Sequence, residues 1–67
     1  MTPSTLGQRI VEARRRLGLT QPALAAAAGV GLRFLVELER GKATAELGKA
    51  LAVLDALGID VDFRDRT

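Results

Sequence analysis

The chain has 67 residues, enough for a single domain, and its formal net charge is +2. Cysteine, histidine and tyrosine are all absent, which excludes disulfide bonds and Cys/His metal sites and removes three of the common catalytic side chains. Neither a dinucleotide-binding nor a P-loop glycine motif is present, so we expect a protein that is not an enzyme and that needs no cofactor or metal.

The charge is unevenly distributed along the chain. Residues 1–18 carry four arginines against one glutamate, whereas residues 43–67 carry three basic against five acidic side chains. The positive end suits a polyanion such as DNA, although a solvated helix face would look the same. The N-terminus is polar and then basic, and apolar runs such as 23–28 are short. We therefore expect a soluble cytoplasmic protein without a signal peptide or membrane span.

The first two predicted helices are marked by caps and glycines. The first is expected to begin after Ser4 or Thr5 and to end at Leu17, with Gly18 as its left-handed stop. Its apolar positions recur at intervals of four, three and four: Leu6, Ile10, Ala13 and Leu17. The second helix is expected over 21–28, with Thr20 as its N-cap and Gly29 as its stop.

Two further helices follow. One is predicted over 32–40, ending at Gly41, and the other from an N-cap at Thr44 to Leu57. The predicted inward stripe of the last helix consists of Leu47, Ala50, Leu51, Leu54 and Leu57. Gly48 lies inside this helix at a cost of about 1 kcal/mol relative to alanine, which suggests close packing there.

Near the end of the sequence the spacing of apolar residues changes from a helical pattern to alternation. Ile59, Val61 and Phe63 alternate with charged residues, a pattern typical of a strand. No other segment alternates in this way, so the strand lacks a partner within the chain. We therefore expect it to pair with its own copy across a homodimer, with Val53, Ile59, Val61 and Phe63 in the dimer interface.

The segment 19–42 has the layout of a helix-turn-helix, two short helices joined by a tight glycine-containing turn. Ala25 is small where the helices would cross, and Gly29 allows the turn. Leu24, Leu35 and Leu38 are placed to anchor both helices to the body. The outward side of the second helix is left free to enter a DNA groove.

At these residues the chain resembles the Xre/Cro-type helix-turn-helix regulators, which include phage repressors. The resemblance rests on Leu19-Thr20-Gln21, Leu24-Ala25, Gly29-Val30 and Leu38-Glu39-Arg40-Gly41-Lys42. It implies an all-α, lambda-repressor-like bundle of four helices, with an N-terminal arm at 1–5, a DNA-binding domain at 6–58 and a strand and tail at 59–67. Residues 42–49, 54–58 and the tail resemble more narrowly the HipB-type antitoxins, which dimerise through a C-terminal strand, repress their own operon and bind a HipA-type kinase toxin.

The resemblance also implies roles for individual residues. Gln21 would bond a DNA phosphate, and Arg14 and Glu39 would form a structural ion pair. Arg33 is the expected reader of guanine, Leu32 would meet a thymine methyl group, and Glu37 would accept from cytosine or orient Arg33. The complete set of expected DNA-binding residues is Gln21, Gly31, Leu32, Arg33, Val36, Glu37, Arg40 and Lys42.

The chain also departs from the family pattern. Gly31 stands where Ser or Thr usually caps the recognition helix, so a hydroxyl contact to DNA would be lost. Leu32 and Phe34 are more apolar than usual, and Phe34 suits packing against the first helix as well as a place beside the DNA backbone. Three hypotheses for the function stay open. The chain is an autoregulating antitoxin, a phage-type or housekeeping regulator without a toxin, or a protein-interaction module that keeps only the helix-turn-helix shape.

Overall fold

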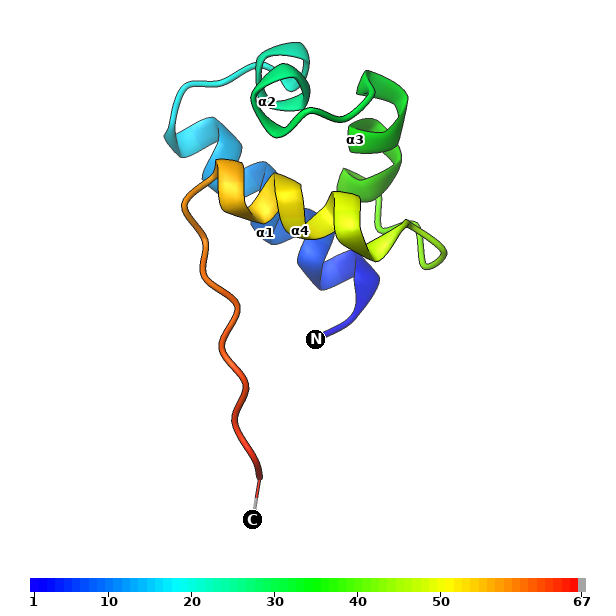
Figure 1. Ribbon diagram of the computed structural model, residues 1–67, viewed down its shortest axis with the longest axis vertical. Helices are drawn as coiled ribbons and strands as arrows, with labels where there is room; N and C mark the ends of the chain where they lie inside the picture. Colours follow the sequence, from blue (N-terminus) through cyan, green and yellow to red (C-terminus); the bar gives the residue numbers. More distant parts are fainter. Residues whose placement is uncertain (67) are drawn as a thin grey trace.

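A computed structural model describes residues 1–66 as four α-helices followed by an extended tail. The helices are α1 (Pro3–Arg16), α2 (Gln21–Ala28), α3 (Leu32–Glu39) and α4 (Leu47–Ala56). Figure 1 shows α2 and α3 together at one end, with the tail running away from the helices. None of the helices in this part of the chain has both the length and the apolar character that a bilayer crossing needs. Thr67, the end of the predicted tail 59–67, lies outside the described residues.

Helix α1 begins earlier than predicted. Thr2 is its N-cap, and its hydroxyl accepts from the Thr5 amide at 3.1 Å. Pro3 follows at the first helical position, where its fixed φ suits a helix start and its missing N–H costs nothing. The expected N-terminal arm 1–5 is therefore wrong beyond Thr2, because residues 3–5 form the first turn of α1.

Helix α2 has the predicted bounds, with Thr20 accepting from the Ala23 amide at 3.2 Å. Helix α4 begins later than predicted, because Glu46 rather than Thr44 is its N-cap and accepts from the Lys49 amide at 2.9 Å. Ala43 and Thr44 instead form a turn between α3 and α4.

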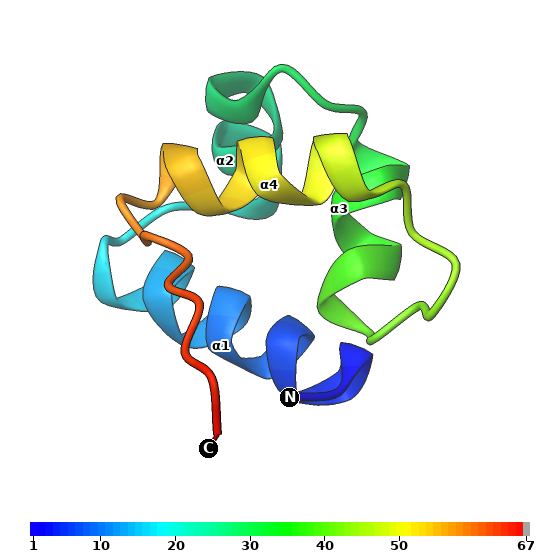
Figure 2. The ribbon, with the colours of Figure 1, turned by 60° about the horizontal axis from the view of Figure 1, so that its bottom comes forward.

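The helices pack in a chain of contacts. α1 lies against α3, and α2 lies against both α3 and α4. In Figure 2 the tail leaves the end of α4 and runs past α1. A groove of about 490 Å³ lies between α1 and α4.

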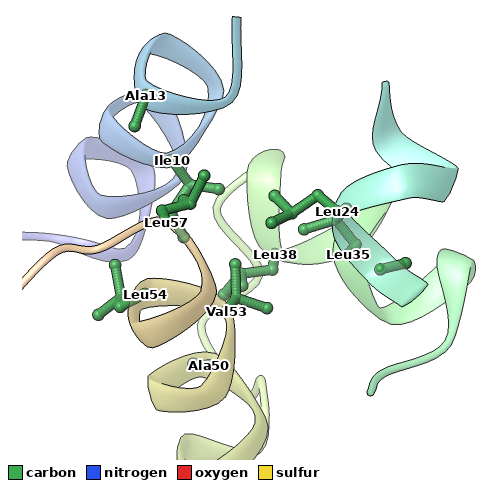
Figure 3. Close-up of a cluster of buried hydrophobic side chains, with 10 residues drawn as sticks. Ile10, Ala13, Leu24, Leu35, Leu38, Ala50, Val53, Leu54 and Leu57 are labelled. Atoms are coloured by element: carbon green, nitrogen blue, oxygen red, sulfur yellow. The ribbon is translucent and has the colours of Figure 1, made fainter. Parts of the chain in front are cut away.

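The core is built from small and branched apolar side chains of all four helices, which meet between them (Figure 3). Its buried members are Ile10, Ala13, Leu24, Ala25, Leu35, Leu38, Ala50, Val53, Leu54 and Leu57. The predicted anchors of α2 and α3 are therefore confirmed.

Part of the predicted apolar stripes is wrong. Leu47 and Leu51 are exposed, and Val53 takes a fully buried place on α4 that the prediction had not given it. Leu17 is also exposed, because α1 has ended and Leu17 is its C-cap. Val53 is 0% exposed, so its assignment to a dimer interface is wrong. Its side chain is enclosed by the core of its own chain and has no surface left for a partner.

Close backbone packing occurs at Gly7 rather than at Gly48. A Cβ at Gly7 would lie 2.5 Å from the Glu39 carbonyl oxygen and 2.8 Å from that of Leu38. At Gly48 the nearest such neighbours are side-chain oxygens of Glu46 at 3.8 Å. Gly7 thus lets α1 rest directly on the end of α3, and the expectation of close packing at Gly48 is wrong.

These two glycines give a matched pair of variants. Gly7→Ala is expected to lower the free energy of unfolding by about 1–3 kcal/mol or more, because its methyl group meets rigid backbone. Gly48→Ala is expected to be neutral or to stabilise by up to about 1 kcal/mol, because the site is helical and open. Urea denaturation followed by circular dichroism measures both. Equal stability of the two variants would contradict the packing of α1 on α3.

Candidate nucleic-acid interface

The turn between α2 and α3 separates two distinct short helices. Gly29 ends α2 with φ of 71°, in the left-handed region that favours glycine. The Val30 amide then donates to the Ala25 carbonyl at 3.0 Å, and Gly31 is extended as the N-cap of α3. Residues 21–40 are therefore not one continuous rod, and the left-handed turn predicted at Gly29 is confirmed.

The two faces of α3 differ sharply. Leu35 and Leu38 are buried, three residues apart, and hold the helix against the core. On the outer side the first turn presents Leu32, which is 46% exposed, and Arg33, which is also exposed. Arg33 therefore points away from the body, as a side chain that reads a base edge must.

A largely buried polar network ties α1, α2 and α3 together. Arg14 Nε donates to Glu39 Oε2 at 2.7 Å and Arg14 Nη2 to Glu39 Oε1 at 3.2 Å, a bidentate pair. Arg14 Nη1 also donates to the Leu19 carbonyl at 3.0 Å. The structure thus contains the ion pair between Arg14 and Glu39 that the family resemblance implied.

Gln21 belongs to the same network, a contact that the sequence analysis missed. Its Nε2 donates to Glu39 Oε1 at 2.8 Å. Since a carboxylate only accepts, this bond turns the amide so that its carbonyl oxygen points away from Glu39. Within residues 1–66 the second N–H of Gln21 makes no hydrogen bond, and a phosphate contact from Gln21 stays a prediction.

The C-terminal end of α3 carries basic groups. Arg40 is exposed at the C-cap, and Lys42 Nζ lies 3.3 Å from Glu37 Oε1. Lys42 therefore neutralises an acidic group that would otherwise repel phosphate from this side of α3. Val36 and Glu37 are half-buried, between the exposed first turn and the core face.

Phe34 packs within the fold. It is half-buried against the core cluster, and Lys49 Nζ from α4 lies 5.7 Å from the centre of its ring. The group over the Phe34 ring is thus a lysine of α4. The sequence had suggested packing against α1 or a place beside the DNA backbone. Lys49 adds a basic group near α3 that the sequence did not reveal, because the pairing of Lys49 with Phe34 depends on where the tertiary fold places the start of α4.

The comparisons with known proteins agree with this geometry. Residues 10–64 match the family model described as Helix-turn-helix (HTH_3). The chain is also 49% identical over 62 residues to an uncharacterized HTH-type transcriptional regulator, y4mF, of Sinorhizobium fredii (strain NBRC 101917 / NGR234), covering 92% of this chain and 82% of that protein.

The chain belongs to the helix-turn-helix family of transcriptional regulators.

Two solved structures share the fold over the whole chain. One is a complex of a HipB variant with an O2 20mer, and the other is described as MDT Protein. Each superposes with a TM-score of 0.89 at 21% identity, and the chain covers 93% and 94% of them respectively. The four-helix fold of this helix-turn-helix protein is therefore that of HipB.

In this helix-turn-helix protein the N-cap of α3, Gly31, provides no side-chain hydrogen bond to the first turn of the helix. Gly31 has φ −71° and ψ 150°, which any residue adopts, and a Cβ there would have no neighbour within 4 Å among residues 1–66. Gly31→Ser is therefore expected to raise the free energy of unfolding by a few tenths of a kcal/mol, through a cap bond to an α3 amide. Thermal unfolding measures the change. A decrease of about 1 kcal/mol would contradict the open cap site.

The predicted strand residues of the helix-turn-helix protein differ in their surroundings. Ile59 is half-buried against the core, and its amide donates to the Leu54 carbonyl at 2.9 Å. Val61 is 48% exposed and Phe63 91% exposed. Within residues 1–66 no strand forms, so the strand and its pairing across a dimer stay predictions.

Proposed function

We propose that this chain is a sequence-specific DNA-binding repressor that acts as a homodimer on a palindromic operator in its own promoter. The observation that supports this most is the two-sided α3, whose buried Leu35 and Leu38 leave Arg33 directed outward from the domain. A bidentate contact from Arg33 to guanine O6 and N7 would provide specificity. In a dimer the two α3 helices would lie about 34 Å apart, one turn of B-DNA.

The proposed phosphate contacts surround α3. Gln21, at the start of α2, would use the amide N–H that does not bond Glu39, together with the helix N-terminus. Arg40 and Lys42 would hold phosphates at the other end of α3. Gly31, Leu32, Val36 and Glu37 would line the groove between these contacts. Contacts to phosphate position the protein, and Arg33 then selects the sequence.

The test is binding to DNA from the chain's own promoter, compared with a scrambled duplex of equal length and composition. Fluorescence anisotropy at salt concentrations from 50 to 200 mM is expected to show promoter affinity roughly 1,000-fold or more above the scrambled duplex. Affinity for both is expected to fall linearly with log salt, because phosphate contacts release counterions. Equal affinity for the two duplexes would refute sequence-specific repression.

We further propose that the repressor is the antitoxin of a HipBA-type pair and binds a HipA-like kinase toxin. The supporting observations are the shared fold with HipB and the residues of 42–49 and 54–58. Co-expression with the product of the adjacent gene is expected to relieve its toxicity and to yield a stable complex. An isolated gene would favour a phage-type or housekeeping regulator instead.

A second candidate function is a protein-interaction module, which the 46% exposed Leu32 beside the half-buried Val36 favours. The double variant Arg33→Ala/Lys42→Ala separates the two. If the chain is a repressor, the double variant is expected to lose operator binding, while any complex with another protein persists. Unchanged operator binding by this double variant would count against the DNA-reading role of α3.

A further inference from the structure

The outer side of α3 has two flanks. With 3.6 residues per turn, Phe34 lies about 100° to one side of Arg33, and Glu39 lies about 120° to the other side. Leu35 and Leu38 occupy the remaining side of the helix, which faces the core. α3 therefore directs Arg33 outward between a Phe34 flank and a Glu39 flank.

Both flanks of α3 would face phosphate in a DNA complex. An α-helix with its side chains is about 10–12 Å across, and the major groove of B-DNA is about 12 Å wide. A helix that fills this groove has one sugar-phosphate backbone on each side. Gln21 lies on the Glu39 flank, because its Nε2 bonds the Glu39 carboxylate at 2.8 Å. A donor to the other backbone has to come from the Phe34 flank.

Lys49 of α4 supplies a cation on the Phe34 flank. Its Nζ lies 5.7 Å from the centre of the Phe34 ring, and Figure 2 shows the first turn of α4 next to α3. Lys49 is exposed, and its ammonium group makes no hydrogen bond or ion pair within residues 1–66. Because the ring attracts the ammonium without accepting a hydrogen bond in the ordinary sense, the N–H groups can still donate to phosphate oxygens.

Two acidic side chains could repel phosphate from this flank, and each has a partner. Glu37 is paired with Lys42, whose Nζ lies 3.3 Å from Glu37 Oε1. Glu46 caps α4, and its Oε2 accepts from the Lys49 backbone amide at 2.9 Å. Glu46 thus occupies the N-terminus of α4, where an anion would otherwise be attracted. The side chain of Lys49 is left as the donor that α4 offers to DNA.

We infer that Lys49 binds a phosphate on the DNA strand opposite the strand that Gln21 would contact, so that α3 is held from both edges of the major groove. The inference deepens the proposed function and rests on it, because these phosphates meet the protein only when α3 lies in the groove. The contact comes from α4, whereas all the contacts proposed above belong to residues 19–42.

The salt dependence of DNA binding tests this contact. Lys49→Met keeps much of the apolar stem over Phe34 but removes the charge. It is expected to weaken binding to the operator and to the scrambled duplex by the same factor, roughly fivefold to tenfold at about 0.1 M salt, and to reduce the slope of log affinity against log salt by about one. Lys49→Arg keeps the charge and is expected to restore the slope. Arg66→Met, the matched control, removes an equal charge from the exposed tail and is expected to leave the slope unchanged.

Neutral methylphosphonate groups, placed singly along the operator, test which strand Lys49 contacts. In each half-site one substitution is expected to weaken binding by the unaltered chain but not by Lys49→Met. The substitution to which Gln21→Ala is insensitive is expected on the other edge of the groove. An unchanged salt slope in Lys49→Met, or both contacts on the same edge, would overturn the inference.

The two proposals fail in different ways. Equal affinity of the unaltered chain for operator and scrambled DNA would refute sequence-specific repression and leave the Lys49 contact standing, since phosphates occur in both duplexes. A specific chain whose salt slope does not depend on Lys49 would leave repression standing and refute the Lys49 contact.

Discussion

Arg14→Met is expected to destabilise the domain by about 3–5 kcal/mol, a large part of the 5–15 kcal/mol that stabilises a typical domain. The Glu39 side chain is 4% exposed and accepts two bonds from Arg14 and one from Gln21. Methionine fills much of the space of arginine but leaves this carboxylate buried with Gln21 alone. An uncompensated buried charge is far more costly than the loss of an exposed ion pair.

Urea denaturation at pH 7, followed by far-ultraviolet circular dichroism, measures the loss. Arg15→Met, on the exposed side of α1, is the matched control and is expected to change stability by less than about 0.5 kcal/mol. Adding Glu39→Gln to Arg14→Met removes the buried charge and is expected to recover part of the stability. A loss below about 1 kcal/mol in Arg14→Met would show that the pair is not a structural support.

Arg33→Ala is expected to weaken binding to the proposed operator by about 1–3 kcal/mol, or roughly tenfold to 150-fold, with a smaller loss on scrambled DNA. The reason is that a base contact supports only the specific complex, whereas phosphate contacts support both. Because Arg33 is exposed and makes no ion pair within residues 1–66, the fold is expected to lose less than about 0.5 kcal/mol.

Fluorescence anisotropy at one fixed salt concentration measures both affinities. Arg33→Lys keeps the charge but loses the planar pair of donors, so it is expected to resemble Arg33→Ala on the operator and the unaltered chain on scrambled DNA. If Arg33→Ala lowered both affinities by the same factor, Arg33 would be a phosphate contact and another residue would read the bases.

The sequence alone determined α2, α3 and the turn between them, because these depend on interactions between residues close together in the chain. Thr20 caps α2 within one helical turn, and Gly29 provides the left-handed residue between α2 and α3. The buried and free faces of α3 follow from the spacing of Leu35 and Leu38. Each of these features depends on residues three or four positions apart, which a single sequence displays.

The tertiary structure alone decided which faces of α1 and α4 are covered. Val53 is buried while Leu47 and Leu51 stay exposed, because the direction in which α4 crosses α2 selects its inward side. Gly7 proves to be the close contact because α1 rests on the last carbonyls of α3, and Gln21 meets Glu39 across 18 positions of sequence. Such contacts join segments whose separation in space no local pattern encodes.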